Sequence, residues 1–348
     1  MIRIAIVGTG NMAHAHAGAY ATMRGVKMVA CCDIIEERAT AFAEKYHIPA
    51  VYTDYREMLE REKLDAVSNV TPDSVHAEVA LAVIARGLAI MSEKPLAANL
   101  DEARRMADAA RKAGVINVVN FTYRNSSGAQ KAAEIIRDGK IGRVVHVEAS
   151  YLQGWLSRLD WHESPRHLWR LSTRHGSSGD LGDLGCHIYD MVSFLCGDIA
   201  TIQCQLKAFD KQVANNTIGE YVLDANDSFI STITFANGAL GTVHSSRWAA
   251  GQMNSIRVRV YGDQGAIEID LDRSYDEYRI CAGAKDMASC TWKTVKCRPT
   301  PNNFQRFIRA IKTGVQDVSD FANAEKVQAY LHYSIASDTQ KALAGVEF

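Results

Sequence analysis

One lysine and one acid–imidazole pair are the residues of this 348-residue chain whose types and spacing could do chemistry. Lys94 lies in the segment Ser92-Glu93-Lys94-Pro95, directly after an apolar run at 88–91 that is typical of a buried strand. Side chains just beyond the carboxyl ends of parallel strands face the crevice in which α/β sheets bind ligands. Because proline disfavours helical angles in the preceding residue, Lys94 should enter that crevice from an extended backbone, with Glu93 close enough to orient its ammonium group. An ion pair at the end of a surface strand is the alternative interpretation.

Asp183 and His187 form the acid–imidazole pair. They are four residues apart, so they share one face if the segment is helical. A carboxylate beside an imidazole favours proton uptake near neutrality, and removal of hydride from an alcohol needs a base that takes the hydroxyl proton. A helix-start aspartate beside an unrelated histidine is the alternative. A metal site would be a third, but no His-Glu-x-x-His pattern or cysteine cluster accompanies the pair, so we expect no metal.

A glycine turn near the start of the chain predicts dinucleotide binding. The turn Gly8-Thr9-Gly10-Asn11-Met12-Ala13 follows an apolar strand at 2–7 and opens a helix that runs to about residue 23. Such a turn brings backbone and helix N-terminus close to a pyrophosphate, so Gly8, Gly10, Asn11 and Met12 are expected to contact the cofactor.

The acid that should hold the cofactor's ribose is Asp33. It ends the next expected strand, at 26–32, and lies 25 residues after Gly8. Its carboxylate would repel a 2′-phosphate, and Ile34 follows it where an arginine could have received one. We therefore expect NAD as the cofactor rather than NADP.

Alternating strands and helices continue through the first third of the chain. Apolar runs near 50–52, 65–69, 88–91 and 115–120 are separated by helical patterns at 54–62, 73–86 and 101–113. Six strands with intervening helices predict a doubly wound parallel sheet, a Rossmann domain, over residues 1–122. Its crevice should also present four further cofactor-binding residues beside Lys94, with the histidine among them acting as a structural support: Thr71, Pro72, His76 and Glu93.

Residues 123–348 predict a second domain of a different class. Alternating patterns indicate strands at 144–152, 201–208, 228–235, 240–246, 256–261 and 266–271, with helices at 126–138, 302–312 and 324–342. Asn237-Gly238 is a hairpin signal. Strands grouped in this way predict an α+β domain with a large, mostly antiparallel open sheet for substrate binding and oligomerisation, and a last helix that could pack back on the first domain.

A tryptophan-rich stretch at 151–174 suits a polyhydroxylated ligand. Tryptophan faces pack on the C–H faces of sugar and cyclitol rings, and Gln and Arg side chains bind hydroxyl groups. A plug of tryptophans at the domain interface is the alternative. Besides Asp183 and His187, the expected substrate-binding residues are Tyr123, Gln153, Trp155, Arg166 and Trp169.

Composition excludes several classes of function. The formal net charge of −1 argues against nucleic-acid binding, which needs a basic surplus. No run of 18 uncharged apolar residues is present, and the chain opens on a strand pattern without a signal-peptide layout, so we expect a cytoplasmic protein with no membrane partner. The eight cysteines include no Cys-x-x-Cys pair, which favours reduced, mostly buried thiols.

Taken together, these signatures resemble those of the glucose–fructose oxidoreductase, inositol dehydrogenase and MocA (Gfo/Idh/MocA) family over nearly the whole chain. The combination is specific to the family although each signature alone is not. The matching segments are Gly8-x-Gly10 with His16, Thr71-Pro72-x-x-x-His76, Ser92-Glu93-Lys94-Pro95-Leu96, Tyr123-Arg124, Gly139-x-Ile141-Gly142 and Asp183-x-x-x-His187.

The resemblance implies a Lys-Asp-His catalytic set. Lys94 would bond both the substrate hydroxyl and the cofactor ribose, His187 would be the general base, and Asp183 would bind a neighbouring hydroxyl. A cis Lys94–Pro95 peptide and a homodimer or homotetramer formed through the C-terminal sheet are also implied. Thr122, Asn125 and Asp180 depart from the family pattern, which bears on the substrate pocket more than on the mechanism.

The expected function is transfer of hydride from a secondary ring hydroxyl of a sugar, anhydrosugar or inositol to NAD, giving a keto-sugar or inosose. Two alternatives stay open. One is NAD-dependent glycoside cleavage through transient oxidation, and the other is a non-catalytic sugar sensor. Retention of Lys94, Asp183 and His187 together argues against the sensor, which has no need for all three.

Overall fold

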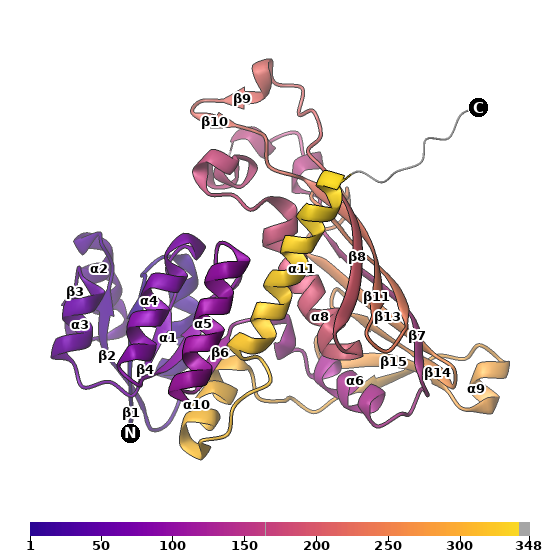
Figure 1. Ribbon diagram of the computed structural model, residues 1–348, viewed down its shortest axis with the longest axis horizontal. Coiled ribbons are helices and arrows are strands. Elements are labelled where there is room, and N and C mark those ends of the chain that lie inside the picture. Colours follow the sequence, from indigo (N-terminus) through magenta and orange to yellow (C-terminus); the bar gives the residue numbers. More distant parts are fainter. Residues whose placement is uncertain (164, 341–348) are drawn as a thin grey trace. The chain divides into compact units, whose positions relative to one another are not determined.

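The computed structural model describes residues 1–163 and 165–340, drawn in colour in Figure 1. The described chain divides into two compact units. The first contains residues 1–122 and 301–328, and the second contains residues 123–300 and the stretch that begins at Ala329. Residues 301–328, expected in the second domain, thus belong with the first, because α10 (Asn303–Thr313) buries its apolar face in the core of that unit.

The sheet of the first unit confirms the predicted Rossmann fold. All of its strand pairs are parallel, and their order is β3-β2-β1-β4-β5-β6, the doubly wound arrangement. The carboxyl ends of β1 and β4, next to each other at the point where the order reverses, form the usual ligand-binding position. The strands are β1 (Ile2–Val7), β2 (Val26–Cys32), β3 (Ala50–Tyr52), β4 (Ala66–Asn69), β5 (Ala89–Ser92) and β6 (Asn117–Val119).

The helices of this unit begin and end where local signals place them. The side chains of Asp54, Asn99 and Asn302 cap α3, α5 and α10, and Gly114 and Gly314 end α5 and α10 in the left-handed conformation that glycine adopts readily. The core cluster joins strand residues to α1 and α10. The helices are α1 (Asn11–Ala21), α2 (Glu36–Tyr46), α3 (Tyr55–Arg61), α4 (Asp73–Ala85), α5 (Leu100–Ala113) and α10.

The second unit is built on an eight-stranded sheet of order β16-β15-β14-β13-β7-β12-β11-β8. Only the β7–β12 pair is parallel among its described pairs, so the predicted, mostly antiparallel α+β domain is confirmed. The expected Asn237-Gly238 turn joins β11 to β12, with Gly238 at φ +87°. The strands are β7 (Val144–Leu152), β8 (Ile199–Lys207), β11 (Ser228–Phe235), β12 (Leu240–Ser246), β13 (Ser255–Gly262), β14 (Gly265–Asp270), β15 (Glu277–Ala282) and β16 (Lys293–Lys296).

Helices cover one face of this sheet. The helices α6 (Ser127–Arg137) and α8 (Cys186–Cys196) lie against β7, β12, β13, β14 and β15, and α11 (Phe321–Gln340) bonds β8 through Ser337 and Asp338 (Figure 1). Inward positions such as Phe229, Ile233 and Val243 are buried, whereas the alternate positions of β11 and β12 face outward. Two short helices complete the described set: α7 (Pro165–Leu168) and α9 (Ala284–Ala288).

A small satellite cluster lies beside the sheet. Leu156, Leu171 and Leu223 form its buried centre, and Trp155 and Trp161 pack against it. The cluster is built from 3₁₀ turns within 155–175 and from the two-stranded sheet of β9 (Thr217–Ile218) and β10 (Tyr221–Val222). These two tryptophans thus pack in a local core of the second unit.

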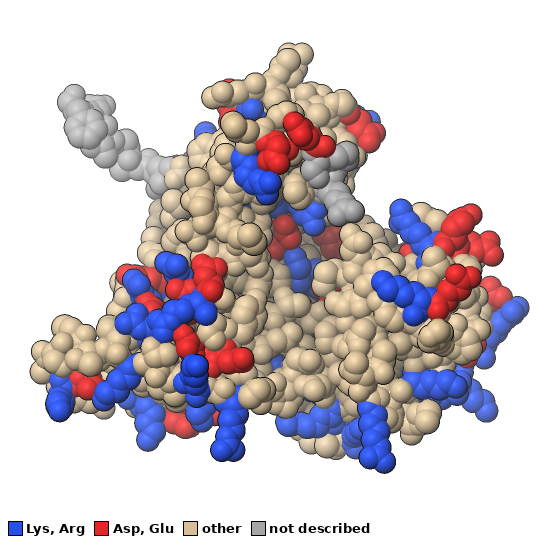
Figure 2. Space-filling view, turned by 180° about the vertical axis from the view of Figure 1, so that it is seen from behind, with Lys and Arg blue, Asp and Glu red and all other residues tan. Residues whose placement is uncertain are grey.

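Figure 2 shows charged side chains of both signs gathered in several groups, with uncharged surface between them. The chain carries exposed ion pairs, such as Arg61 with Glu57 at 2.9 Å, and pairs of this kind stabilise a protein by at most about 1 kcal/mol. In the described part of the chain, we find no helix with the length and apolarity to cross a bilayer.

Candidate functional site

The glycine turn after β1 can hold a pyrophosphate. Gly8 has φ +86°, and a Cβ atom there would lie 2.5 Å from the carbonyl oxygen of Val70, so only glycine fits. Gly10 is the N-cap of α1 and supplies no side-chain cap, and a Cβ there would meet nothing within 4 Å. Asn11 and Met12 are exposed at the start of the helix. Open space and amide groups without a side-chain cap are what an anion at a helix N-terminus needs.

Asp33 stands beside this turn. Its Oδ2 accepts hydrogen bonds from the amide and the hydroxyl of Thr9, both at 2.9 Å, and its Oδ1 accepts one from the amide of Ile35 at 3.0 Å. The carboxylate is thereby held at the end of β2, where a ribose-binding acid is expected. Thr9 was not among the predicted residues, because a threonine between two glycines carries no sequence signal of its own.

His76 links two loops of the same crevice. Its Nε2 lies 2.8 Å from the carbonyl oxygen of Thr71 and its Nδ1 lies 2.9 Å from that of Pro95. The side chain is buried, in keeping with the supporting role expected for it. The Lys94–Pro95 peptide is cis, as the family resemblance implied. Contacts of Thr71 and Pro72 with a cofactor remain predictions.

Glu93 is the centre of a buried network. His16 Nε2 lies 2.8 Å from its Oε1, and Asn120 Nδ2 donates to the same oxygen at 2.7 Å. Its Oε2 accepts from the backbone amide of Lys94 at 3.3 Å. Burial raises the pKa of the carboxyl, but the hydrogen bond and charge of His16, the Asn120 bond and the Lys94 charge outweigh it and lower the pKa to about 2. Glu93 is therefore an anion that holds the backbone of the half-buried Lys94.

In the second unit, Asp183 and His187 lie on consecutive turns of one helical segment. The segment begins with a π-helical turn, Leu181–Gly185, which passes into α8. The predicted helix is therefore present, with a wider first turn of a type that occurs often at functional sites. Gly182 permits this turn, because a Cβ there would lie 2.1 Å from Ser178 Oγ. The side chain of Asp183 is one-third exposed, whereas His187 is buried.

Tyr123 contacts the imidazole of His187, and Arg124 supports the turn that carries Tyr123. Arg124 makes a bidentate pair with Asp190 of α8, with Nε to Oδ2 at 2.8 Å and Nη2 to Oδ1 at 2.7 Å. Both side chains are buried. The pair fastens the turn at 122–125 to α8 and sets the Tyr123 ring edge-on to the imidazole of His187, with ring centroids 4.7 Å apart.

A chain of hydrogen bonds joins Tyr123 to other side chains, of which Tyr151 also lies beside the imidazole of His187, with ring centroids 6.1 Å apart. The Tyr123 hydroxyl lies 2.6 Å from that of Tyr151 and accepts from Asn254 Nδ2 at 2.8 Å. Asn254 Oδ1 accepts from the Tyr151 hydroxyl at 2.6 Å and from Gln153 Nε2 at 2.9 Å, and Trp155 Nε1 donates to Gln153 Oε1 at 3.1 Å. Burial raises the pKa of Tyr151, so its hydroxyl keeps its proton. The structure thus brings together three of the residues expected to bind substrate, Tyr123, Gln153 and Trp155, and adds Tyr151 and Asn254 to the set; their contact with a substrate stays a prediction.

Asp183 is flanked by two arginines. Arg247 Nη2 donates to its Oδ2 at 3.1 Å, and Arg170 Nε lies 3.7 Å from the same oxygen. Arg247 is fully buried and also faces Asp180, whose Oδ2 accepts a hydrogen bond from Ser245. Sequence reasoning missed Arg247, because an isolated arginine after a strand has no spacing that connects it to residues 64 positions earlier.

The remaining predicted substrate residues lie apart from this network or are not described. Trp169 is 41% exposed and packs its ring under the guanidinium of Arg170, at 4.6 Å. The side chain of Arg166 lies outside the described residues. No group of three or more potential metal ligands occurs in the described part of the chain.

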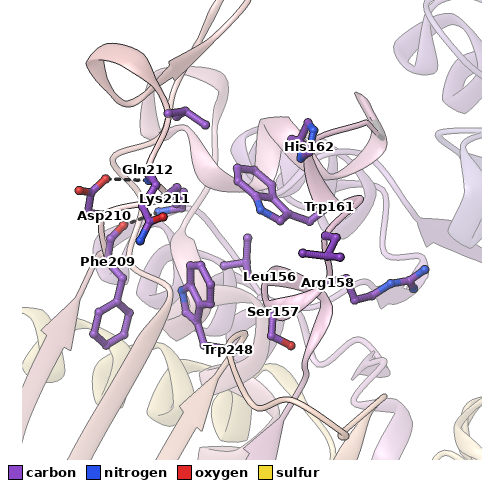
Figure 3. A pocket seen from close by; sticks show the side chains of 12 residues that line it. Leu156, Ser157, Arg158, Trp161, His162, Phe209, Asp210, Lys211, Gln212 and Trp248 are labelled. Atoms are coloured by element: carbon purple, nitrogen blue, oxygen red, sulfur yellow. Dashed lines mark hydrogen bonds between the residues drawn. The ribbon is translucent and has the colours of Figure 1, made fainter.

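A pocket of about 660 Å³ opens between the turns at 155–163 and the loop at 209–213 (Figure 3). Its walls are aromatic and apolar, with Trp161 and Trp248 as the largest side chains. None of the predicted catalytic or substrate-binding residues lines it. The lining residues are Leu156, Ser157, Arg158, Leu159, Trp161, His162, Phe209, Asp210, Lys211, Gln212, Val213 and Trp248.

Two family models match the chain. Residues 2–121 match the model described as an oxidoreductase family with an NAD-binding Rossmann fold, and residues 129–268 match the GFO/IDH/MocA C-terminal domain. The first match covers the whole six-stranded sheet, and the second covers the larger sheet from β7 into β14.

Relatives with an assigned activity act on sugars and cyclitols. The levoglucosan dehydrogenase of Pseudarthrobacter phenanthrenivorans is 29% identical over 312 residues, which cover 82% of this chain and 77% of the relative. The scyllo-inositol 2-dehydrogenase (NAD(+)) of Bacillus subtilis is 30% identical over 270 residues, which cover 77% of this chain and 73% of the relative. Among solved structures, a levoglucosan dehydrogenase in complex with NADH and levoglucosan superposes with a TM-score of 0.86 at 26% identity, covering 98% of each chain.

Proposed function

The chain belongs to the Gfo/Idh/MocA family of oxidoreductases, and we propose that it oxidises a secondary ring hydroxyl of a sugar, anhydrosugar or inositol with NAD as the acceptor. Levoglucosan, a sugar anhydride, is the first substrate to test, because relatives that act on it match the chain in both sequence and fold.

The residues of the first unit fit an NAD molecule. The glycine turn and the uncapped start of α1 offer amide donors to the pyrophosphate, and Asp33 offers a carboxylate oxygen to the ribose. When bound, NAD supplies a nicotinamide ring that accepts hydride. Glu93, as an anion fixed by His16 and Asn120, holds the backbone of Lys94.

Lys94, Asp183 and His187 each contact the substrate in a different role. His187 takes the proton from the reacting hydroxyl as the C–H bond of that carbon is broken. Lys94 donates a hydrogen bond to the same hydroxyl and fixes its direction, and Asp183 accepts a hydrogen bond from a neighbouring hydroxyl. Tyr123 keeps the imidazole in one plane by its edge-on contact at 4.7 Å.

The observation that carries this proposal is the polar wall beside His187. Tyr123, Tyr151, Gln153 and Asn254 form one connected set of hydrogen-bonding side chains, and Trp155 ends it with an aromatic face. A wall that joins hydroxyl and amide groups to an indole ring matches a ligand with several hydroxyl groups on an apolar ring.

The test is a panel of sugars, anhydrosugars and inositols with NAD and with NADP, read as NADH or NADPH formation at 340 nm. We expect turnover with NAD and at least one panel member. His187→Gln should lower kcat by about 100-fold or more, whereas His162→Gln, an exposed histidine of the same unit, should match wild type. Near-native activity of His187→Gln, or release of an aglycone without net NADH, would contradict the proposed reaction.

We also propose that the C-terminal sheet pairs with a second copy of the chain. Ile230 and Leu240 are 64% and 59% exposed on the outward face of β11 and β12, and both are apolar side chains that a partner would cover. Sedimentation should show a dimer or tetramer that Ile230→Asp together with Leu240→Asp dissociates. A monomeric wild-type protein would contradict this assembly.

A reducing compartment, the cytoplasm, is the proposed location. All eight cysteines are free thiols, and six of them are buried. Burial raises the pKa of Cys31 to about 11 and that of Cys32 to about 12, which keeps this vicinal pair unreactive.

A further inference from the structure

Arg247 is buried between two carboxyl groups. Its Nη2 donates to Asp183 Oδ2 at 3.1 Å, and its Nε lies 3.9 Å from Asp180 Oδ1. Its remaining bonds go to the carbonyl oxygens of Arg170 and Gly179, at 3.0 and 3.2 Å. The guanidinium therefore connects the loop before the π-helical turn with the acid that this turn presents.

Two of the atoms that face each other here are buried without a hydrogen bond. Asp180 Oδ1 and Arg247 Nε have no hydrogen-bonding partner among the described residues. Their separation of 3.9 Å is longer than a hydrogen bond by about 1 Å. Since the guanidinium is a rigid plane, a movement of Nε toward Asp180 also changes the direction in which Nη2 points at Asp183.

The charge of Asp180 decides whether that movement is favoured. Burial raises its pKa to about 8, Asp183 and Asp227 act in the same direction, and Arg247 and the Ser245 hydrogen bond act against it. Asp227 is itself paired with Lys211 at 2.8 Å. Asp180 is therefore neutral at pH 7 and becomes an anion above about pH 8.

We infer that Arg247 is a positioning residue for Asp183. The protonation of Asp180 decides whether the guanidinium of Arg247 binds Asp183 alone or binds both carboxyl groups. The inference rests on the proposed function, in which Asp183 binds a substrate hydroxyl. While Asp180 is neutral, Arg247 fixes Asp183 as an acceptor. Once Asp180 is ionised, Arg247 turns toward it and the hold on Asp183 weakens. Asp180, which departs from the family pattern, thereby has a specific task.

The activity test compares pH profiles of kcat/KM for the best panel substrate between pH 6 and 9.5. Wild type should lose activity above about pH 8, and Asp180→Asn, which keeps the neutral form at every pH, should lack that decline. Asp317→Asn is the matched control, since it makes the same change at another largely buried carboxyl paired with an arginine, and it should keep the decline. A decline at the same pH in Asp180→Asn would overturn the inference.

Arg247 itself is tested by two substitutions. Arg247→Met should raise KM by about 30-fold or more, and Arg247→Lys, which keeps the charge without the planar fork, should recover part of that loss. NAD affinity, measured on the same samples, should stay within about 2-fold and shows that the first unit is intact. A KM within about 2-fold of wild type in Arg247→Met would overturn the positioning role.

A third comparison needs no substrate. The folded-state pKa of Asp180 lies above the usual value of 3.8, so the stability that its proton contributes is full below pH 3.8 and is lost as the pH rises to about 8. Between pH 6 and 8 the unfolding constant of wild type should rise about tenfold per pH unit relative to Asp180→Asn. Equal slopes would overturn the inference. If no panel sugar is oxidised, the proposed function fails first, and this comparison alone decides whether Asp180 titrates beside Arg247.

Discussion

Replacing Glu93 with Gln tests the buried network that holds Lys94. The pKa of Glu93 lies at about 2 in the folded chain, against its usual value of 4.5. Each pKa unit corresponds to about 1.4 kcal/mol, so the ionised carboxylate stabilises the folded chain by about 3 kcal/mol at neutral pH. Glu93→Gln keeps an oxygen that can accept from Asn120 but removes the charge, and it should lose most of that stability.

The sign of the pH dependence follows from the lowered pKa. Stability from Glu93 is present above pH 4.5 and is lost as the pH falls toward about 2. The difference in the free energy of unfolding between wild type and Glu93→Gln should therefore shrink from about 3 kcal/mol at pH 7 to about 1 kcal/mol at pH 3.

Urea unfolding followed by two signals makes the assay specific. All five tryptophans lie between residues 155 and 292, so their fluorescence reports the second unit, whereas far-UV circular dichroism reports both. Glu93→Gln should shift the circular dichroism transition more than the fluorescence transition. Glu44→Gln, at an exposed position of α2, should change stability by less than about 0.5 kcal/mol. A difference for Glu93→Gln that is the same at pH 7 and pH 3 would refute the charge argument.

Two further perturbations address the buried Lys211–Asp227 pair of the second unit and the glycine turn. Lys211→Met should lower the free energy of unfolding by about 3 to 5 kcal/mol, followed by tryptophan fluorescence, because it leaves Asp227 buried without its cation. The double variant with Asp227→Leu should recover most of this loss. No recovery would contradict the pairing. Gly8→Ala should weaken NAD binding by about 10-fold or more in calorimetry, since its Cβ would meet Val70; unchanged affinity would exclude the turn from the cofactor site.

The parts of the fold that sequence reasoning predicted are those with strong local patterns. The strands at 2–7, 26–32, 228–235 and 240–246 match the structure at both ends, because each is a buried apolar run or a strict alternation. Gly8 and Asp33 directly follow the first two, and the Asn237-Gly238 turn lies between the other two. The NAD-binding domain and the open sheet followed from the order of such elements.

The elements that were missed lack such patterns. The helix α2 lies between Asp33 and β3, and the expectation assigned nothing to it, although its Glu-Glu start and buried Ala39 and Phe42 give it a helical face. The strands β15 and β16 carry charged residues such as Arg279 and Lys293 and lie at the edge of the sheet, where pairing depends on their neighbours more than on their own apolarity.

Site residues that belong to a sequence motif were predictable, whereas residues that only the tertiary fold brings to the site were not. Lys94 and His187 follow from their motifs. Arg247 and Asn254 come from the end of β12 and the loop after it, and the tertiary fold brings them to Asp183 and Tyr123, which lie 64 and 131 positions earlier. Contacts between residues so far apart in the chain have no fixed spacing that a single sequence could reveal. Trp155 and Trp161 both pack against the satellite cluster, and Trp155 also donates a hydrogen bond to Gln153 of the polar wall.

The central claim is that one substrate hydroxyl meets both Lys94 and His187. A crystal structure of the protein with NADH and the sugar that turns over fastest measures this directly, through the distances from the reacting oxygen to Lys94 Nζ and to the nearer imidazole nitrogen of His187. Both distances should be about 3 Å. A well-ordered sugar beside the nicotinamide, with either distance beyond about 5 Å and no bridging water, would contradict it.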